Sequence, residues 1–286
     1  MKPLAIVTKF YNEPAYLPLW LGHYGRQVGL ANCYLLDHGT DDGSARALGA
    51  ANVIRLIRSP QDDYHHLRVI KTMCAELLTR YRYVLHVDLD EFVVADPAAY
   101  ASLADYAARC ESELISMIGL ELQHIPDREA PLDPSQPILA QRRHVWFNSA
   151  LCKPNFTRGP LGWSPGFHCM KADTVFDDLY LFHLRYVDRD IGLQRLHRSR
   201  SQPWSHPDQA SHQRLTDERW LAMLHGFASP DRLSDITAER QSAPLRAHLD
   251  RVIESRAGRE TQDYRIDLSI HSPELWRTAD RFSTIF

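Results

Sequence analysis

The sequence predicts an α/β protein built on an open, mostly parallel β-sheet with helices on both faces. Over the first 110 residues, short apolar runs rich in β-branched and aromatic residues alternate with segments whose apolar residues recur at helical spacing. This alternation is typical of a parallel sheet that is covered on both sides. Polar, acidic stretches follow several of the apolar runs. We therefore expect a ligand site at the edge where the strands end.

The first half of the chain supplies the main elements of this sheet. Apolar runs predict strands at residues 4–8, 33–36, 53–57 and 83–94, with the first of them central. A broad apolar face predicts a helix from residue 16 to Gly25 or Gly29, and regular apolar spacing predicts another over 65–80. Asp96-Pro97 has the form of an N-cap followed by a first-turn proline. It predicts a third helix that ends near Cys110.

The second half is less regular. Strands are expected at residues 114–122, 145–152 and 180–184, separated by loops rich in proline and glycine. Helical spacing returns at 216–227 and 236–256, the second segment partly broken at Pro244, and the tail from residue 264 shows no strong periodicity. We therefore divide the chain into an α/β domain over 1–200 and a helical C-terminal extension over 201–286. The extension could act as a lid or mediate self-association.

Composition excludes some partners and compartments. A formal net charge of −3 argues against a protein that binds nucleic acid by neutralising phosphates. Arginines do concentrate between Arg185 and Arg200, enough for a local anion site. The five cysteines are scattered, odd in number and without a Cys-X-X-Cys motif, which fits a reduced, cytoplasmic protein. The sequence has neither a signal-peptide pattern nor an apolar run of the roughly 20 residues that span a bilayer, but peripheral membrane contact remains open.

Asp88 and Asp90 are the most informative pair of residues. They stand in the run Val87-Asp88-Leu89-Asp90-Glu91-Phe92, at the end of a buried strand. Residues two apart in an extended chain point to the same side, so the two carboxylates can converge. Such a pair repels unless a cation lies between the carboxylates or one is protonated. The pattern predicts a divalent-metal site, although a strand end whose acids face water would explain Asp-X-Asp by itself.

Four segments in this order resemble a known family. They are residues 9–13 (Lys-Phe-Tyr-Asn-Glu), 34–44 (ending in Asp-Asp-Gly-Ser), 87–92 and 182–186 (Phe-His-Leu-Arg-Tyr). Together they resemble the family 2-like glycosyltransferases, in particular a bacterial branch with an Asp-X-Asp-Glu-Phe strand. The resemblance runs from about Ile6 to Arg200, two thirds of the chain. It implies the GT-A fold, a Rossmann-like open mixed sheet flanked by helices.

The same resemblance implies a reaction. Enzymes of this kind move a sugar from a nucleotide-diphosphate sugar, here a UDP-sugar, to a hydroxyl of a glycan or lipid-linked glycan. The resemblance implies a metal-dependent transfer with inversion at the anomeric carbon and a role in surface polysaccharide synthesis. It would place the protein in the cytoplasm, with the inner face of the membrane as a possible working site, and would leave the C-terminal extension on the acceptor side.

The resemblance also implies residues that bind the nucleotide. Asn12, Glu13 and Asp37 would hold the base and the ribose, because amide and carboxylate oxygens accept hydrogen bonds from ribose hydroxyls and base N–H groups. Asp41 or Asp42 could do the same. The alternative for residues 37–44 is a polar turn, which their Gly, Asp and Ser content would satisfy without a ligand.

The metal ligands follow from the same comparison. Asp90, with Asp88, would bind Mn2+ or Mg2+ at the diphosphate, and Asp88 would contact the nucleotide as well. His183 is the candidate third ligand, and a histidine favours Mn2+. A core histidine with satisfied hydrogen bonds is the alternative. Arg185 could reach a phosphate, or could simply be solvated.

The general base that accepts the proton of the acceptor hydroxyl is harder to place, because the sequence lacks the Glu-Asp pair familiar in this family. Glu121, at a predicted strand end, is the first candidate, and Asp173 is also assigned a catalytic role. Asp127 and His168 lie in the same part of the chain. Trp163 and His168 could instead contact the sugar or the acceptor, or be structural.

Two other functions fit parts of the pattern. A nucleotidyltransferase shares the carboxylate pair and the α/β sheet, but residues 9–14 contain no glycine, whereas that class has a Gly-rich loop after the first strand. A non-catalytic protein that binds sugars or nucleotides is the third possibility. Intact Asp88 and Asp90 argue against it.

Overall fold

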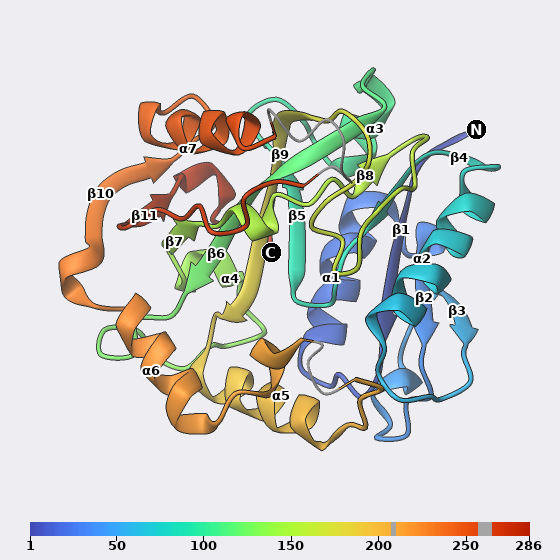
Figure 1. Ribbon diagram of the computed structural model, residues 1–286, viewed down its shortest axis with the longest axis horizontal. Coiled ribbons are helices and arrows are strands. Elements are labelled where there is room, and N and C mark those ends of the chain that lie inside the picture. Colours follow the sequence, from blue (N-terminus) through green and yellow to red (C-terminus); the bar gives the residue numbers. More distant parts are fainter. Residues whose placement is uncertain (207–209, 257–264) are drawn as a thin grey trace.

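The computed structural model describes residues 1–206, 210–256 and 265–286, and one large mixed sheet runs through this part of the chain (Figure 1). Residues 207–209 and 257–264, which belong to the predicted C-terminal extension and its tail, lie outside the described residues. The strands of the first half are β1 (Lys2–Phe10), β2 (Cys33–Asp37), β3 (Asn52–Arg55), β4 (Tyr81–His86) and β5 (Glu91–Ala95). Those of the second half are β6 (Leu114–Gln123), β7 (His144–Phe147), β8 (Phe156–Thr157), β9 (Val175–Tyr186), β10 (Leu233–Ala238) and β11 (Leu275–Thr278).

Helices and short 3-10 turns connect these strands. The helices are α1 (Tyr16–Val28), α2 (Asp63–Leu77), α3 (Leu103–Arg109), α4 (Ile138–Gln141), α5 (Arg189–Ser201), α6 (Asp217–Phe227) and α7 (Ala243–Glu254). The 3-10 turns that matter for the site are η3 (Ser149–Leu151) and η4 (Ser211–Arg214). The expected helices over 16–29, 65–80 and 216–227 are confirmed, with small shifts of their ends.

The predicted parallel sheet forms the first half of the molecule. Its strand order is β4-β1-β2-β3, and all three pairings are parallel. Val7 lies opposite His86, and Phe10 lies opposite Asp37, so the carboxyl ends of β1, β2 and β4 meet at one edge. The second half adds antiparallel pairings through β7, β8 and β11, together with β9, which is parallel to β6 and antiparallel to β5. The fold class is therefore confirmed as α/β with a mixed sheet.

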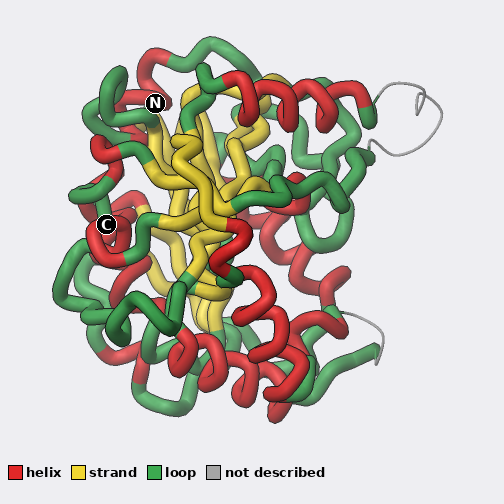
Figure 2. Tube along the Cα trace, turned by 90° about the vertical axis from the view of Figure 1, so that its left-hand side faces the viewer, coloured by secondary structure: helices red, strands yellow, loops and turns green. Residues whose placement is uncertain are grey.

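Helices cover both faces of this sheet, as Figure 2 shows. Successive side chains of a strand point to opposite faces. On β1, Leu4 and Ile6 accordingly pack in a core with residues of α1 and α3, whereas Ala5 and Val7 pack in a second core with residues of α2. β1 is thus an internal strand between β4 and β2, and both of its faces are buried.

The expected single strand over 83–94 is divided in two. β4 ends at His86 and β5 begins at Glu91, and the chain turns between them. The Glu91 N–H donates to the Asp88 carbonyl over 3.1 Å, and the Asp88 N–H donates to Glu91 Oε2 over 3.0 Å. β4 pairs with β1, whereas β5 pairs with β9. The break therefore lies at the segment that carries Asp88 and Asp90.

The helix expected to begin at Asp96-Pro97 begins later, at Leu103. Ser102 is its N-cap and accepts the Asp105 N–H over 3.1 Å. Asp96 instead accepts the Ala98 N–H over 3.0 Å and pairs with Arg281 at 2.7 and 2.8 Å. The distant arginine therefore takes the carboxylate that the local sequence pattern assigned to a helix cap.

The segment after residue 200 is less helical than expected. Residues 233–238 form β10, and the helix α7 starts only at Ala243. Pro244 lies in the first turn of α7, where its missing N–H does no harm, so it begins the helix instead of breaking it. β10 pairs with β11, and β11 pairs with β7, so this segment extends the central sheet. The proposed division of the chain at residue 200 stays a prediction.

Two further features concern the cysteines and the length of the helices. All five cysteines are buried and none is paired in a disulfide. Across residues 1–206, 210–256 and 265–286, no helix combines the length and the apolar character needed to cross a membrane.

We predict that Gly119→Ala destabilises the protein. A Cβ at this position of β6 would lie 2.5 Å from Leu151 Cβ and 2.6 Å from the Asn148 carbonyl oxygen. Overpacking of this kind costs about 1–3 kcal/mol, which urea unfolding measures. Gly226→Ala in α6 is the matched control, because nothing lies within 4 Å of its added Cβ. Equal stability of the two variants would contradict the packing described here.

Candidate active site

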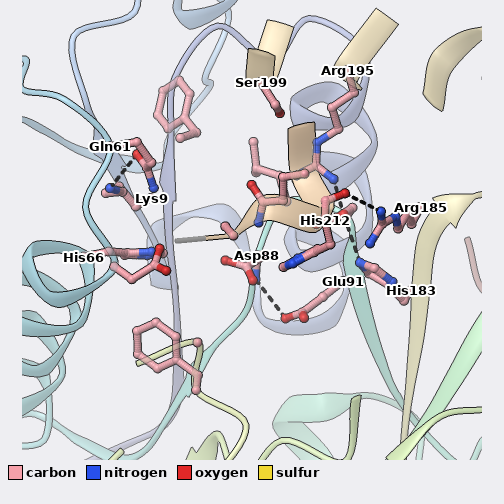
Figure 3. A pocket seen from close by; sticks show the side chains of 18 of the residues that line it. Lys9, Gln61, His66, Asp88, Glu91, His183, Arg185, Arg195, Ser199 and His212 are labelled. Carbon is pink, nitrogen blue, oxygen red and sulfur yellow. Dashed lines mark hydrogen bonds and ion pairs between the residues drawn. The ribbon is translucent and has the colours of Figure 1, made fainter. Parts of the chain in front are cut away.

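A cavity of about 560 Å3 lies at the edge where β1, β4 and β9 end (Figure 3). The loop after β1, the turn between β4 and β5, the helix α5 and the turn η4 contribute to its walls. Its lining is densely charged. The carboxylates are Glu13, Asp63, Asp88, Asp90 and Glu91, and the lysines and arginines are Lys9, Lys153, Arg185 and Arg195. The predicted ligand site at the strand ends is thus matched by a polar cavity.

Lys153 neutralises one side of the turn between β4 and β5. Its Nζ lies 3.1 Å from Asp88 Oδ2 and 2.6 Å from Glu91 Oε1, and its side chain is 5% exposed. Burial works against ionisation of Asp88, but Lys153, together with His86 and His66, outweighs it and holds the pKa of Asp88 below its usual range. Burial alone would lower the pKa of Lys153, but the carboxylates of Glu91 and Asp88 raise it.

Arg195 and His183 neutralise the other side. His183 Nε2 lies 3.0 Å from Asp90 Oδ2, and Arg195 forms an ion pair with the same oxygen. Arg195 also contacts Glu13 at 3.2 Å, and Arg198 contacts Glu13 at 3.1 Å, so two arginines of α5 are tied to the loop after β1. Burial opposes ionisation of Asp90, but Arg195 and then His183 hold its pKa well below the usual range.

Glu121 lies behind His183. The two residues are neighbours in the β6–β9 register, and His183 Nδ1 lies 2.8 and 2.9 Å from the two Glu121 oxygens. Burial would lower the pKa of His183, but the Glu121 and Asp90 carboxylates outweigh it and raise the pKa to about 10. Glu121 is 2% exposed and is not among the residues that line the cavity. A buried carboxylate outside the cavity is better placed to orient His183 than to act as a general base.

Asp90 and His183 are separated by a hydrogen-bond distance that two ligands of one divalent ion would also have. Adjacent ligands of an octahedral ion, each about 2.1 Å from the metal, lie about 3 Å apart, and the two atoms here are 3.0 Å apart. A metal-binding histidine usually donates its other N–H to a carboxylate, which is the contact that Glu121 makes with Nδ1. These three residues therefore fit a divalent cation.

Asp88 has a different environment from Asp90. Among the described residues, one set of three metal-type side chains has all its ligand atoms within 4.8 Å of one another, and it consists of His66, His86 and Asp88. The expected trio of Asp88, Asp90 and His183 does not form such a set. The turn between β4 and β5 gives the two aspartates separate partners, so their expected convergence on a single ion stays a prediction.

Of the residues expected to contact the nucleotide, Glu13, Asp88 and Arg185 line the cavity. Arg185 donates to the His212 carbonyl over 2.7 Å. Asn12 does not line the cavity; its side-chain N–H donates to Asp41 over 2.8 Å, and its backbone has a φ of 49°. It therefore ties the loop after β1 to the loop after β2.

Asp37 and Asp42 take part in the loop after β2. Asp37 forms an ion pair with Arg55 and accepts the Thr40 N–H over 2.8 Å. Asp42 accepts the Ser44 N–H over 2.9 Å. Neither residue is among those that line the cavity. These contacts are those of the polar turn that we considered as the alternative, and a role in nucleotide binding stays a prediction.

Of the residues expected on the acceptor side, some line the cavity and others do not. Asp173 is exposed, and neither it nor Asp127 is among the residues that line the cavity. Trp163 is buried and donates its indole N–H to the Pro154 carbonyl over 2.9 Å. His168 does line the cavity, and its Nδ1 lies 2.6 Å from the Ala150 carbonyl. Burial, with help from Lys153, lowers the pKa of His168 to about 4, so its ring is neutral.

Several residues of the cavity were not expected from the sequence. Lys153 lies in an irregular stretch that has no local signal. Arg195 belongs to the arginine-rich segment that predicted an anion site, but its partner Asp90 lies 105 positions away in the chain. Lys9 belongs to the segment 9–13 and had no predicted role of its own. Burial lowers its pKa to about 8, and its Nζ lies 3.4 Å from Gln61 Oε1.

Comparisons with known proteins give distant likenesses only. No family model matches this sequence, and no curated protein matches it. Among solved structures, TarS from S. aureus is 15% identical with a TM-score of 0.35, over 81% of this chain and 44% of that chain. The mannosyltransferase PcManGT from Pyrobaculum calidifontis, in complex with GDP-Man and Mn2+, is 12% identical with a TM-score of 0.28, over 44% of this chain and 36% of that chain.

A third structure, mannose-1-phosphate geranyltransferase from Thermus thermophilus, is 13% identical with a TM-score of 0.32, over 79% of this chain and 65% of that chain. This chain therefore spans between about a third and two thirds of the length of these structures. Likenesses this distant do not indicate an activity, which has to be inferred from the site.

We predict that His183 stays protonated up to about pH 10 in the metal-free protein. Because its folded pKa lies above the ordinary value of about 6.5, the stability it contributes is fully present below pH 6.5. That stability is lost as the pH rises through 10. Nitrogen NMR of the imidazole in EDTA measures the titration, and urea unfolding at several pH values measures the stability. Glu121→Gln should lower the pKa, and a wild-type titration near 6.5 would contradict the arrangement.

Proposed function

We propose that this chain is a metal-dependent glycosyltransferase. It would transfer a sugar from a nucleotide-diphosphate sugar, a UDP-sugar in the first instance, to a hydroxyl of a glycan or lipid-linked glycan acceptor. The observation that supports this best is the pairing of Asp90 with His183, backed by Glu121, in a charged cavity at the ends of parallel strands. The resemblance of four sequence segments to family 2-like glycosyltransferases supports the same assignment.

The charges of the cavity suit a diphosphate. A divalent cation held by Asp90 and His183 would neutralise the charge that builds up on the leaving nucleoside diphosphate. Lys9, Arg185 and Arg195 line the same cavity and can donate to phosphate oxygens, the arginines in bidentate fashion. Arg195 would then exchange part of its contact with Asp90 for the phosphate. The carboxylates would bind the cation, and the basic side chains would bind the anion.

We assign the role of general base to His168. Its Nδ1–H donates to the Ala150 carbonyl, so the lone pair of the neutral ring is on Nε2. This nitrogen can accept the proton of the acceptor hydroxyl as that hydroxyl attacks the anomeric carbon, a direct displacement that inverts the configuration. A bound diphosphate would raise the pKa of His168 from about 4 towards a useful range, because a nearby anion favours the protonated ring. An acceptor in surface polysaccharide synthesis is consistent with this chemistry.

We predict that UDP or GDP binds only with a divalent metal. Calorimetric titration of the protein with each nucleotide, in Mn2+, in Mg2+ and in EDTA, measures this directly. Asp90→Asn should abolish the metal-dependent binding, and Glu121→Gln should weaken metal affinity by about 10–100-fold. Asp235→Asn is the control, since Asp235 is an exposed residue of β10. Unchanged binding in Asp90→Asn would refute the assignment, and binding without any sugar transfer or hydrolysis would favour a binding protein.

We also predict that His168→Gln separates binding from transfer. Loss of a general base lowers kcat by about 10²–10⁴-fold, whereas nucleotide affinity should be unchanged because the cation and the basic side chains remain. Transfer from the sugar nucleotide that binds best is the assay, with nucleotide release as its readout. If kcat is retained, the base is another residue.

A further inference from the structure

Two histidines lie beside Asp88 at the wall of the cavity. His86 is the last residue of β4, and His66 lies in the first turns of α2. Their rings are 5.6 Å apart between centroids, and one ligand atom from each of His66, His86 and Asp88 lies within 4.8 Å of the other two. In Figure 3 the His66 and Asp88 side chains extend into the same pocket. Three side chains of metal-binding type thus meet at one point, although they come from separate elements.

Three ring nitrogens of these two histidines lack hydrogen-bond partners among the described residues. His86 is 0% exposed, and neither of its nitrogens forms a hydrogen bond with a described residue. His66 Nε2 is also buried without a partner. Buried polar groups are almost always satisfied, so a fully buried imidazole with two unpaired nitrogens requires an explanation. A bound metal ion would satisfy one nitrogen of each ring.

The surroundings of the set contain two lysines, Lys9 and Lys153, whose charges add to the effect of burial and lower the pKa values of both histidines. Lys153 contacts both Asp88 and Glu91, so it can stay with Glu91 when a cation takes Asp88. The Phe167 ring lies 4.1 Å from the His86 ring and 5.3 Å from the His66 ring between centroids, and it gives the site one apolar wall. Burial favours neutral imidazoles, the form that binds metals.

We propose that His66, His86 and Asp88 hold a divalent transition metal, separate from the Asp90–His183 pair. Two imidazoles and one carboxylate suit Zn2+ better than Mg2+ or Ca2+, which prefer oxygen ligands. Three protein ligands leave a coordination position open. His66 and Asp88 line the cavity, so a bound ligand could occupy that position. This site does not depend on the proposed transfer reaction.

Zinc titration of the full-length protein, stripped of metal with a chelator that is then removed, tests the proposal. Calorimetry gives the affinity and stoichiometry for Zn2+, and the visible absorption of Co2+ reports the geometry of its ligands. The titrations are run in the wild type and in Asp90→Asn. The Asp90→Asn variant should no longer bind an ion at the Asp90–His183 pair, so the remaining binding reports the proposed site. Circular dichroism confirms that each variant is folded.

In the Asp90→Asn background, His66→Gln should weaken Zn2+ binding at least about tenfold. The matched control is His65→Gln, which removes the neighbouring histidine of the same helix and should leave the affinity unchanged. His86→Gln provides a second test of the set if that variant folds. The proposal is overturned if Asp90→Asn alone removes all Zn2+ binding, if His65→Gln and His66→Gln behave alike, or if the wild-type protein does not bind Zn2+.

Discussion

The structure depends on neutralising three carboxylates in one short turn. Asp90 and Glu91 are buried and Asp88 is half-buried, and burying an ion without a partner costs several kcal/mol. Their partners are Lys153, His183 and Arg195. These cations come from the stretch after η3, from β9 and from α5, three segments that are distant from the turn in sequence. The charge of the turn therefore constrains where the second half of the chain can lie.

The same ion pairs bear on how Asp90 and His183 would bind a metal ion. A cation bound at Asp90 and His183 would compete with Arg195 for the Asp90 carboxylate. Arg195 and Arg198 also contact Glu13, so these ion pairs connect Asp90 with α5 and with the loop after β1. The metal and an anionic ligand would then bind together, because the arginine released by one can contact the other.

The sequence predicted the local elements well and the long-range partners poorly. Apolar runs and helical spacing located β1, β2, α1 and α2, because burial of an apolar face is what forms such elements. The helix α5 was missed, since it buries only Gly192 and Leu196 and is otherwise arginine-rich. β10 and β11 were missed because they are short and their pairing partners are remote. The break after His86 was not predicted, because Val87 and Leu89 alternate with the two aspartates and apolar residues resume at Phe92, as they would in a continuous strand.

The site shows the same contrast. The resemblance singled out Asp90 and His183, and the structure places them in contact. Glu121 was expected to be a base because it lies near the end of a predicted strand, but the structure places it opposite His183 and in contact with it. This register cannot be read from a single strand. Lys153 and His86 carry no sequence signal: the first lies in an irregular stretch, and the second lies within an apolar strand. Their importance follows only from the fold.

Anomalous diffraction from crystals of this chain grown with Mn2+ would test the central claim most directly. We predict a manganese peak within about 2.5 Å of both Asp90 Oδ2 and His183 Nε2, with Glu121 still hydrogen-bonded to His183 Nδ1. Arg195 should have moved away from at least part of its contact with Asp90. The absence of a peak at saturating Mn2+, with Arg195 unmoved on Asp90, would show that this carboxylate is a structural partner of arginine and not a metal ligand.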